Sequence, residues 1–186
     1  GAVANGTATN QATVTVVDAN SNPLPDQVVT WSQDGSAVVG ASAKTDSNGQ
    51  TTVTFTDLKA ETVNITATVN STSQSKPSTF VADSSTAKVS DLTVTSGAVA
   101  NGTATNQATV TVVDGKNNPQ PDQVVTWTQD GSAVVGTSAK TDSNGQTTVT
   151  FTDLKAETVN ITATVNGSSQ SKPSTFVADS STAKVS

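Results

Sequence analysis

The side-chain oxygens of one acidic segment give this sequence its clearest suggestion of chemistry. Asp18-Ala19-Asn20-Ser21-Asn22 spaces its oxygen-bearing residues like the first half of a calcium-binding loop. The glycine and the closing glutamate of such a loop are missing, and in a second copy of the segment Lys116 replaces Asn20, which would put a cation among the ligands. Asp also caps the local backbone in ordinary turns. We therefore expect a turn here and predict no metal-ligating residues.

A second position for calcium is the junction between two copies of a repeat described below. Asp83 and Asp91 lie near this junction, together with other acidic residues of the neighbouring loops. Carboxylates from two domains are able to share one calcium ion, because calcium takes six to eight oxygen ligands. This alternative stays open at the level of sequence.

Residue types exclude the common forms of nucleophilic catalysis. The chain has no His and no Cys, so neither a Ser/His nor a Cys/His pair can form. The absence of Cys also excludes disulfides and thiolate metal sites. Paired carboxylates are conceivable, but each Asp that we can place falls at a strand end or in a turn, where capping explains it. We predict that the chain is not an enzyme, with no catalytic or cofactor-binding residues and no cofactor.

Two patterns typical of covalent modification have simpler explanations. The triplets that begin at Asn5, Asn64 and Asn70 fit the glycosylation pattern, which arises by chance in a chain rich in Asn and Thr. A Lys–Asn isopeptide crosslink requires a buried Lys beside an acid. We expect the Lys residues of this chain at turns or strand ends, so we predict no such crosslink.

Composition and charge indicate a folded, β-rich chain. The sequence of 186 residues has a formal net charge of −6 and a hydrophobic fraction of 33%. Its many Val and Thr residues favour pleated, half-buried surfaces, unlike the composition of a disordered chain. The acidic balance argues against nucleic acid and anionic lipid as partners, because both require clustered Lys or Arg. No apolar run approaches the roughly 20 residues of a spanning helix, so we expect no direct membrane insertion by this segment.

A long internal repeat organises the chain. The sequence GAVANGTATNQATVTVVD begins at Gly1 and again at Gly97, which gives a period of 96 residues. Such a period is close to the roughly 100 residues of one immunoglobulin-like domain. We predict two domains, at residues 1–86 and 87–186, with residues 180–186 leading into a further repeat. The copies differ at eight aligned pairs: Ala19/Gly115, Asn20/Lys116, Ser21/Asn117, Leu24/Gln120, Ser32/Thr128, Ala41/Thr137, Ser71/Gly167 and Thr72/Ser168.

Short strands that alternate apolar and polar residues are the elements that must position the acidic residues considered above. In the second copy we predict strands near residues 91–95, 108–112, 125–127, 134–135, 148–152, 159–165 and 176–178. This pattern predicts an all-β fold of two tandem immunoglobulin-like Greek-key β-sandwiches of about seven strands each. Trp127, Phe151 and Phe176 lie on the apolar side of their strands, so we expect them in the core and not on a sugar-stacking surface.

The first copy is expected to lack most of its leading strand. Residues 1–4 contain no counterpart of Leu92 and Val94, and the missing strand would expose an edge that a neighbouring chain is able to cover. An odd number of strands places the termini of a domain at opposite ends. We therefore expect head-to-tail domains in a rod of roughly 70–80 Å, with little bending because the junction lacks Gly and Pro.

Four short motifs occur in the same order in both copies. In the first copy they are Val17-Asp18, Asn22-Pro23, Thr45-Asp46 with Gly49, and Ile65-Thr66-Ala67. This ordered set, which covers nearly the whole chain, resembles the group-one bacterial immunoglobulin-like repeats of the invasin/intimin family of surface adhesins. Two departures, Trp31 in place of a frequent Phe and Glu61 near a frequent Gly, leave the expected fold unchanged.

The resemblance implies a location and a broad role. Such repeats typically follow an outer-membrane β-barrel and carry an adhesive tip outward. We expect stalk or spacer repeats of a bacterial cell-surface adhesin, anchored to the outer membrane through another part of the parent protein. The alternative is a binding module, in which the repeats themselves contact a host ligand or self-associate in a biofilm. The expected partners are neighbouring repeats of the same chain, with a host-cell or self-association partner as a further possibility.

Overall fold

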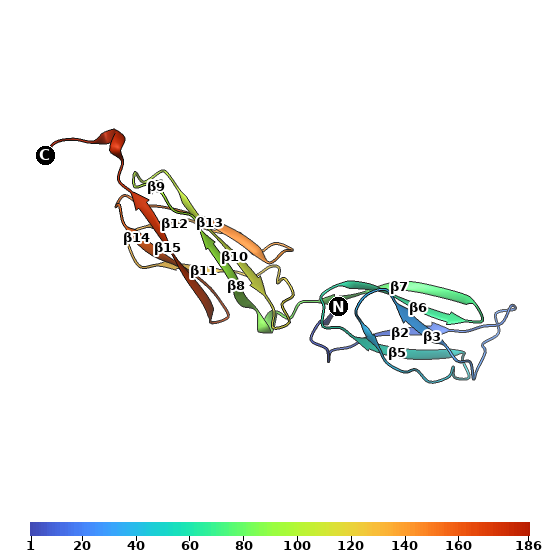
Figure 1. Ribbon diagram of the computed structural model, residues 1–186. Coiled ribbons are helices and arrows are strands. Elements are labelled where there is room, and N and C mark those ends of the chain that lie inside the picture. Colours follow the sequence, from blue (N-terminus) through green and yellow to red (C-terminus); the bar gives the residue numbers. More distant parts are fainter. The chain divides into compact units, whose positions relative to one another are not determined.

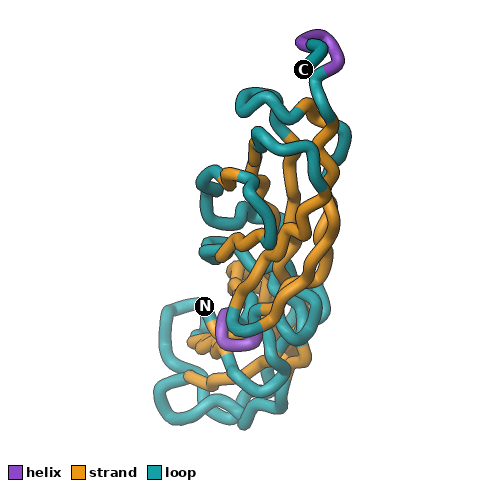
Figure 2. Tube along the Cα trace, turned by 90° about the vertical axis from the view of Figure 1, so that its left-hand side faces the viewer, coloured by secondary structure: helices purple, strands orange, loops and turns teal.

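A computed structural model describes all 186 residues, which form two separate compact units, Gly1–Asp83 (unit 1) and Ser84–Ser186 (unit 2) (Figure 1). The helical segments are short 3-10 turns, η1 (Ser84–Thr86) and η2 (Ser180–Thr182), drawn in purple in Figure 2. No helix is both long and apolar enough to cross a bilayer. The fold is all-β, as predicted. The units divide shortly before the predicted boundary after residue 86.

Unit 2 is a sandwich of two four-stranded sheets. The first sheet has the order β12 (Val134–Val135), β13 (Gln146–Thr152), β10 (Asn106–Val113) and β8 (Lys88–Val94). The second has the order β11 (Thr126–Gln129), β14 (Thr158–Val165), β15 (Ser168–Val177) and β9 (Ala98–Val99). The chain passes from β10 to β11 in the other sheet, returns to β12 and β13, and crosses again to β14 and β15. This is the Greek-key order of an immunoglobulin-like sandwich.

Alternating side chains decide which face of each strand is buried. In β13, Val149 and Phe151 are 1% exposed, while Thr148 and Thr150 between them face solvent. The sequence Thr-Val-Asn-Ile-Thr-Ala-Thr-Val does the same for β14. Phe151 and Phe176 meet edge to face in the interior, with ring centroids 5.9 Å apart. Both Phe residues are therefore in the core, as predicted.

Unit 1 repeats this arrangement with one strand fewer. One sheet has the order β1 (Ala2–Val3), β7 (Thr72–Val81), β6 (Thr62–Val69) and β3 (Thr30–Gln33), and the other has the order β2 (Asn10–Thr15), β5 (Gln50–Thr56) and β4 (Val38–Val39). The counterpart of β8 is missing, so β2 is an edge strand.

The missing strand divides the core of unit 1. In unit 2 one continuous cluster of buried side chains includes Ala87, Val89 and Leu92 from the leading segment. In unit 1 the apolar side chains form two separate clusters, one around Phe55 and Phe80 and a smaller one around Val16. The leading segment is therefore what joins the two halves of the interior.

Trp127 packs against the core, as expected, but it is partly exposed because β11 is the outer strand of its sheet, and its Nε1 donates to Ser138 Oγ at 3.0 Å. Two details of the predicted strands are wrong. Ala178 is exposed and lies beyond the end of β15. That strand begins at Ser168, far before the predicted start, because strand pairing with β14 orders a segment that has little apolar pattern.

Candidate functional site

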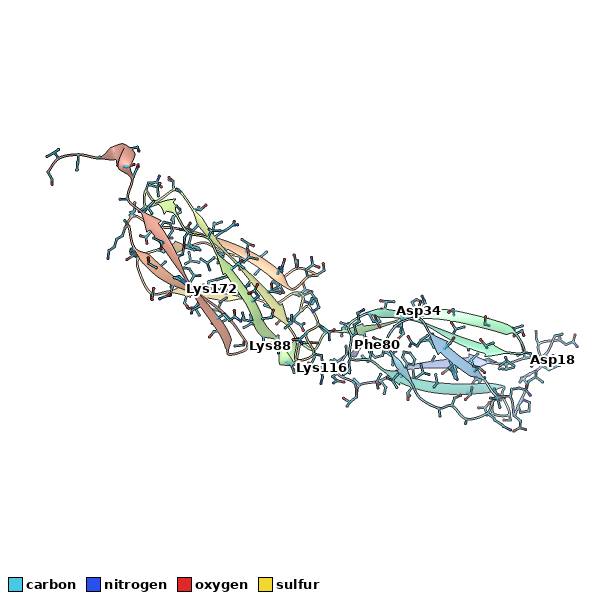
Figure 3. All side chains as sticks on the ribbon, in the orientation of Figure 1. Asp18, Asp34, Phe80, Lys88, Lys116 and Lys172 are labelled. Carbon is cyan, nitrogen blue, oxygen red and sulfur yellow. The ribbon has the colours of Figure 1, made fainter.

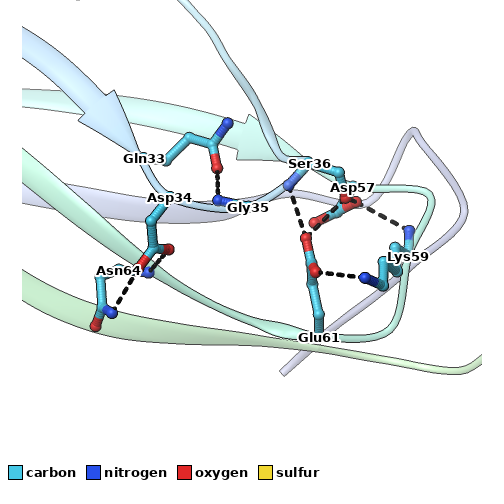
Figure 4. A network of polar contacts seen from close by, with 8 residues as sticks. All are labelled: Gln33, Asp34, Gly35, Ser36, Asp57, Lys59, Glu61 and Asn64. Carbon is cyan, nitrogen blue, oxygen red and sulfur yellow. Dashed lines mark hydrogen bonds and ion pairs between the residues drawn. The ribbon is translucent and has the colours of Figure 1, made fainter.

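A cluster of polar side chains joins the β3–β4 loop to the β5–β6 turn in unit 1 (Figure 4). The carboxylate of Glu61 accepts hydrogen bonds from Ser36 N and Ser36 Oγ, both at 2.7 Å, and lies 3.2 Å from the ammonium of Lys59. Asp57 Oδ1 accepts from Lys59 N at 2.9 Å and lies 2.9 Å from Ser36 Oγ. These contacts tie two loops at one end of the sandwich.

Unit 2 contains the same cluster with nearly the same geometry. Ser132 N donates to Glu157 Oε1 at 2.8 Å, and Lys155 Nζ lies 3.4 Å from Glu157 Oε2. Asp153 occupies the position of Asp57, and each of these two residues is 2% exposed. The cluster is therefore a built feature of the repeat and does not depend on the leading strand.

Hydrogen bonding lowers the pKa of the glutamates in these clusters. The backbone N–H of Ser36, its hydroxyl and then Lys59 stabilise the ionised form of Glu61 and lower its pKa from 4.5 to about 2. Glu157 has a pKa lowered to about 2, mainly by the side chain and backbone of Ser132. Both carboxylates are ionised and fully engaged at neutral pH, so neither is poised to transfer a proton there.

A second carboxylate contact lies beside the first. Asp34 Oδ1 accepts from Asn64 N and Asp34 Oδ2 accepts from Asn64 Nδ2, both at 2.8 Å, and these bonds lower the pKa of Asp34 (Figure 4). Asp130 and Asn160 repeat the pair in unit 2. The pair fixes the end of β3 to β6, and it places a glycosylation-like Asn64 in a structural contact.

One carboxylate oxygen in each acidic cluster raises the question of whether the cluster binds a metal ion. Asp57 Oδ2 and Asp153 Oδ2 are buried and have no hydrogen-bond partner. Two carboxylates alone do not fill the shell of six to eight oxygens that calcium prefers, and the Lys59 ammonium already neutralises Glu61. No group of three or more His, Cys, Asp or Glu side chains is placed to hold a metal ion.

The segment that resembles half of a calcium loop is an ordinary turn. Asp18 Oδ1 accepts from the backbone N–H groups of Asn20 and Asn22, at 2.8 and 2.9 Å, and Oδ2 accepts from Asn22 Nδ2 at 2.9 Å. The carboxylate, labelled at one end of unit 1 in Figure 3, is thus used to cap its own backbone. The predicted turn is therefore observed, while the absence of a metal ligand stays a prediction and the alternative of an ion shared by Asp83 and Asp91 stays open.

No Lys side chain is buried, which removes the main requirement of an isopeptide crosslink. The expectation that each Lys lies at a turn or strand end is wrong for Lys76 and Lys172. These two lie within β7 and β15, and they pair with Ile65 and Ile161 on the side of each strand that faces the core. Both side chains are nevertheless exposed, and Lys172 is labelled in Figure 3.

An open groove follows the uncovered edge of unit 1, between β2 and β7. It consists of two adjoining hollows of about 540 and 460 Å³, and both are lined by Val14, Ala67 and Gln74. We call it the β2 groove. Trp31 lines the larger hollow and its Nε1 donates to Ser42 Oγ at 2.9 Å. Its walls are mixed, with the apolar Val14 and Ala67 beside the polar Gln74, and they follow the edge that β8 covers in unit 2.

Sequence reasoning missed the polar clusters. Their signal was available, because Gly35-Ser36 and Asp57-x-Lys59-x-Glu61 recur at the same offsets in the second copy. Recurrence alone does not separate these residues from the rest of a near-identical repeat. Only the folded chain brings Ser36 to Glu61, which is 25 residues away in sequence.

Taken together, the two Greek-key sandwiches and their loop clusters define a tandem immunoglobulin-like protein. The family of bacterial Ig-like domains (group 1) matches residues 1–81 and 89–177. The chain belongs to this family, which confirms the resemblance inferred from the four motifs.

Relatives of the chain are adhesins. The inverse autotransporter adhesin YeeJ of Escherichia coli (strain K12) is 34% identical over 195 residues, covering 96% of this chain and 8% of that protein. Among solved structures, InvD of Yersinia pseudotuberculosis has a TM-score of 0.76 at 16% identity, covering 99% of this chain and 58% of that chain. The Escherichia coli adhesin FdeC has a TM-score of 0.75 at 18% identity, covering 95% of this chain and 60% of that chain. These two structural likenesses support the fold.

Proposed function

We propose that the two units are spacer repeats in the stalk of a bacterial cell-surface adhesin, where they hold a distal binding region away from the outer membrane. The observation that carries this is that each unit has its own apolar core built on identical inner strands, while its exposed faces carry mainly Thr and Ser. Repetition of such a unit lengthens the stalk, and a spacer needs no binding site of its own in each copy.

The path of the chain through a unit agrees with a spacer. In Figure 1 the chain enters unit 2 at η1 and leaves it at η2, at the opposite end of the sandwich. An entry and an exit at opposite ends of one unit are what a spacer requires. The 34% identity to an adhesin of which the chain spans 8% supports placement within a much longer surface protein. The chain then acts without catalysis or cofactor, and its anchor lies in another part of the parent protein.

Surface display tests the spacer role directly. The chain is inserted once, twice or three times between an outer-membrane anchor and a small binding domain on bacterial cells. We expect the distance between the cell surface and the binding domain, measured by super-resolution microscopy, to rise in proportion to the number of inserts. A distance that does not rise with repeat number would contradict the spacer role.

The alternative is a binding module, in which the repeats themselves contact a host ligand or another copy of the chain. The 186-residue chain is screened for binding to host cells, glycans and immobilised copies of itself. Saturable binding to cells or glycans that is lost on substitution of groove residues would favour the module over the spacer, whereas no such binding supports the spacer.

A further inference from the structure

We propose that Asn166-Gly167, in the turn between β14 and β15, is a site of spontaneous deamidation, and that conversion of Asn166 releases this turn from Ser84 at the start of unit 2. The sequence contains five Asn-Gly pairs, and the folded chain leaves this one free to react while it restrains the other four. The reaction consumes water alone, so the inference is independent of whether the units act as spacers or as a binding module.

The reaction is an intramolecular acyl transfer in which no atom is oxidised or reduced. The main-chain nitrogen of Gly167 gives its proton to water and attacks Cγ of Asn166, and Nδ2 leaves as ammonia. Water then opens the resulting cyclic imide. Opening at Cγ leaves aspartate at this position, whereas opening at the main-chain carbonyl carbon routes the backbone through Cβ and Cγ, as isoaspartate. The attacking nitrogen must be free of other bonds, and glycine hinders it least because it has no Cβ.

In four of the five pairs the glycine N–H is already used by the fold. Gly6 N and Gly102 N donate at 2.9 Å to main-chain carbonyl oxygens just after β5 and β13. Gly49 N and Gly145 N donate at the same distance within their own turns, which lead into β5 and β13. Each of these nitrogens must leave its hydrogen bond before it attacks, so the reaction of these four pairs depends on local opening of the chain.

The same four glycines are packed against their surroundings. A Cβ at Gly49 or Gly145 would lie 2.3 or 2.2 Å from a main-chain carbonyl oxygen, and one at Gly6 or Gly102 would lie 2.8 or 2.9 Å from a leucine side chain. The Asn side chains before Gly6 and Gly102 also accept bonds from two backbone N–H groups each, which hold their carboxamides in place. The main chain of these pairs therefore has little room to turn towards the Asn side chain.

Asn166-Gly167 lacks these restraints. The pair forms the two-residue turn between Val165 and Ser168, with φ of 49° and 74°, and both of its residues are exposed. Gly167 N donates to no other group of the chain, and a Cβ at Gly167 would have nothing within 4 Å. The Asn166 carboxamide makes one contact, from Nδ2 to Ser84 O at 3.1 Å. The attacking nitrogen is thus available in the native chain.

The corresponding turn of unit 1 is a natural control. Asn70-Ser71 has φ of 48° and 65°, and both of its residues are exposed, so the backbone and the access of water are nearly the same as at Asn166-Gly167. The two turns differ in the residue after Asn, and the side chain of Ser71 hinders attack by its own nitrogen. Of the differences between the copies, Ser71/Gly167 is therefore the one that confines the reaction to unit 2.

Conversion of Asn166 removes one of two contacts that hold this turn to the start of unit 2. These contacts are Asn166 Nδ2 to Ser84 O and Val89 N to Ser168 Oγ, both at 3.1 Å. Aspartate has no Nδ2 and would bring a carboxylate oxygen towards the Ser84 carbonyl oxygen, where no hydrogen bond can form. Isoaspartate also adds a carbon atom to the main chain of the turn. Either product therefore weakens the attachment of η1 and the start of β8.

A comparison of the folded and unfolded chain tests the site. The full chain is incubated at mildly alkaline pH, in buffer and in urea, and conversion at each Asn is followed by peptide mapping with mass spectrometry. In urea all five Asn-Gly pairs should convert at similar rates. In the folded chain Asn166 should keep its rate within about threefold, while the other four slow by at least roughly tenfold because they react only from opened states. Faster conversion of another Asn-Gly pair in the folded chain, or equal slowing of all five, would overturn the proposal.

A reciprocal pair of variants tests the role of the residue after Asn. Gly167→Ser copies the sequence of unit 1 into unit 2 and should lower the rate at Asn166 to that at Asn70. Ser71→Gly makes the reverse change and should raise the rate at Asn70 to at least that of Asn166 in the native chain. An Asn70 that stays unreactive before glycine would show that an exposed Asn-Gly turn is not sufficient, and would contradict the proposal.

Amide hydrogen exchange tests the release of the turn. Asn166→Asp supplies the aspartate product in uniform form, and an incubated native chain, separated by its additional negative charge, supplies both products. Each should exchange faster than the native chain at Ala87 and Val89. Ser169→Asp adds the same charge at an exposed neighbouring position and is the matched control, which should leave exchange at these two residues unchanged. Equal exchange in the native chain and both deamidated forms would reject the release.

Discussion

Leu92 and Val110 lie opposite each other in the β8–β10 ladder, and both are fully buried. Val14, which corresponds to Val110 in unit 1, is half-exposed because no strand lies beside it. Two copies with the same inner strands therefore differ in how much apolar surface they remove from water. Since burial of apolar area is the main favourable term in folding, unit 1 should be the less stable of the two.

The leading strand should decide the stability of unit 2. Leu92→Ala removes a buried side chain and should lower the free energy of unfolding of unit 2 by about 2–5 kcal/mol. Thr93→Ala, at the neighbouring exposed position, is the matched control and should change it by less than about 1 kcal/mol. Denaturant unfolding followed by Trp127 fluorescence, in a Trp31→Phe background, measures this. Equal effects of the two substitutions would mean that β8 contributes little to the core.

The same core substitution should have different outcomes in the two units. Phe151→Ala and Phe55→Ala each remove one ring of an edge-to-face pair and should cost about 3–5 kcal/mol. We expect unit 1 to unfold under this loss, because its core is already divided, and unit 2 to remain folded at room temperature. Circular dichroism at 25 °C and thermal scans distinguish the two variants. A folded Phe55→Ala protein beside an unfolded Phe151→Ala protein would reverse the order of stability.

Two glycines with the same backbone conformation should tolerate a side chain differently. Gly145 has φ +75°, and a Cβ there would lie 2.2 Å from Val112 O, so Gly145→Ser should destabilise unit 2 by more than about 2 kcal/mol. Gly167 has φ +74° with nothing within 4 Å of a Cβ, and Ser71 adopts φ 65° at the same position of unit 1. Gly167→Ser should therefore cost no more than about 1 kcal/mol. Urea unfolding midpoints of the two variants give the comparison.

The loop clusters should make stability depend on pH in the acidic range. The pKa of Glu61 and that of Glu157 are about 2 in the folded chain, below the ordinary value of 4.5. The ionised glutamates therefore add stability above about pH 4.5, and this contribution is lost as the pH falls towards 2. The difference in melting temperature between the native chain and a Glu61→Gln, Glu157→Gln variant should be constant from pH 7 to pH 5 and should shrink below it. A difference in melting temperature that stays constant down to pH 2 would contradict the stabilising role of the ionised Glu61 and Glu157.

The alternation of apolar and polar side chains predicted the inner strands, because one face of each strand packs on the core and the other faces solvent. β13 and β14 alternate Val, Ile and Phe with Thr, and their predicted positions lie within a few residues of the observed ones. The local sequence pattern is sufficient to predict a strand where burial depends only on which face of that strand a side chain occupies.

Pairing between distant segments produced the features that were not predicted. The first half of β15 is Ser-Ser-Gln-Ser-Lys-Pro, a strand only because β14 supplies its backbone partners. β9 consists of two residues that pair in parallel with Phe176 and Val177. Trp127 has the alternation of a core residue but lies on an outer strand, so its position depends on sheet order. The Ser36–Glu61 contact likewise joins two loops that no periodicity connects.

Near-identity of the two copies has a consequence for how the chain reaches its native state. β5 and β13 have the same sequence, as do β6 and β14. During refolding from denaturant each of these strands finds two equivalent sets of partners, one in its own copy and one in the other. Interdomain exchange of this kind is a characteristic failure of repeat proteins. A chain that folds from one end as it emerges completes one copy before the strands of the next copy are available. It therefore avoids the pairing between copies that is open to a full-length unfolded chain.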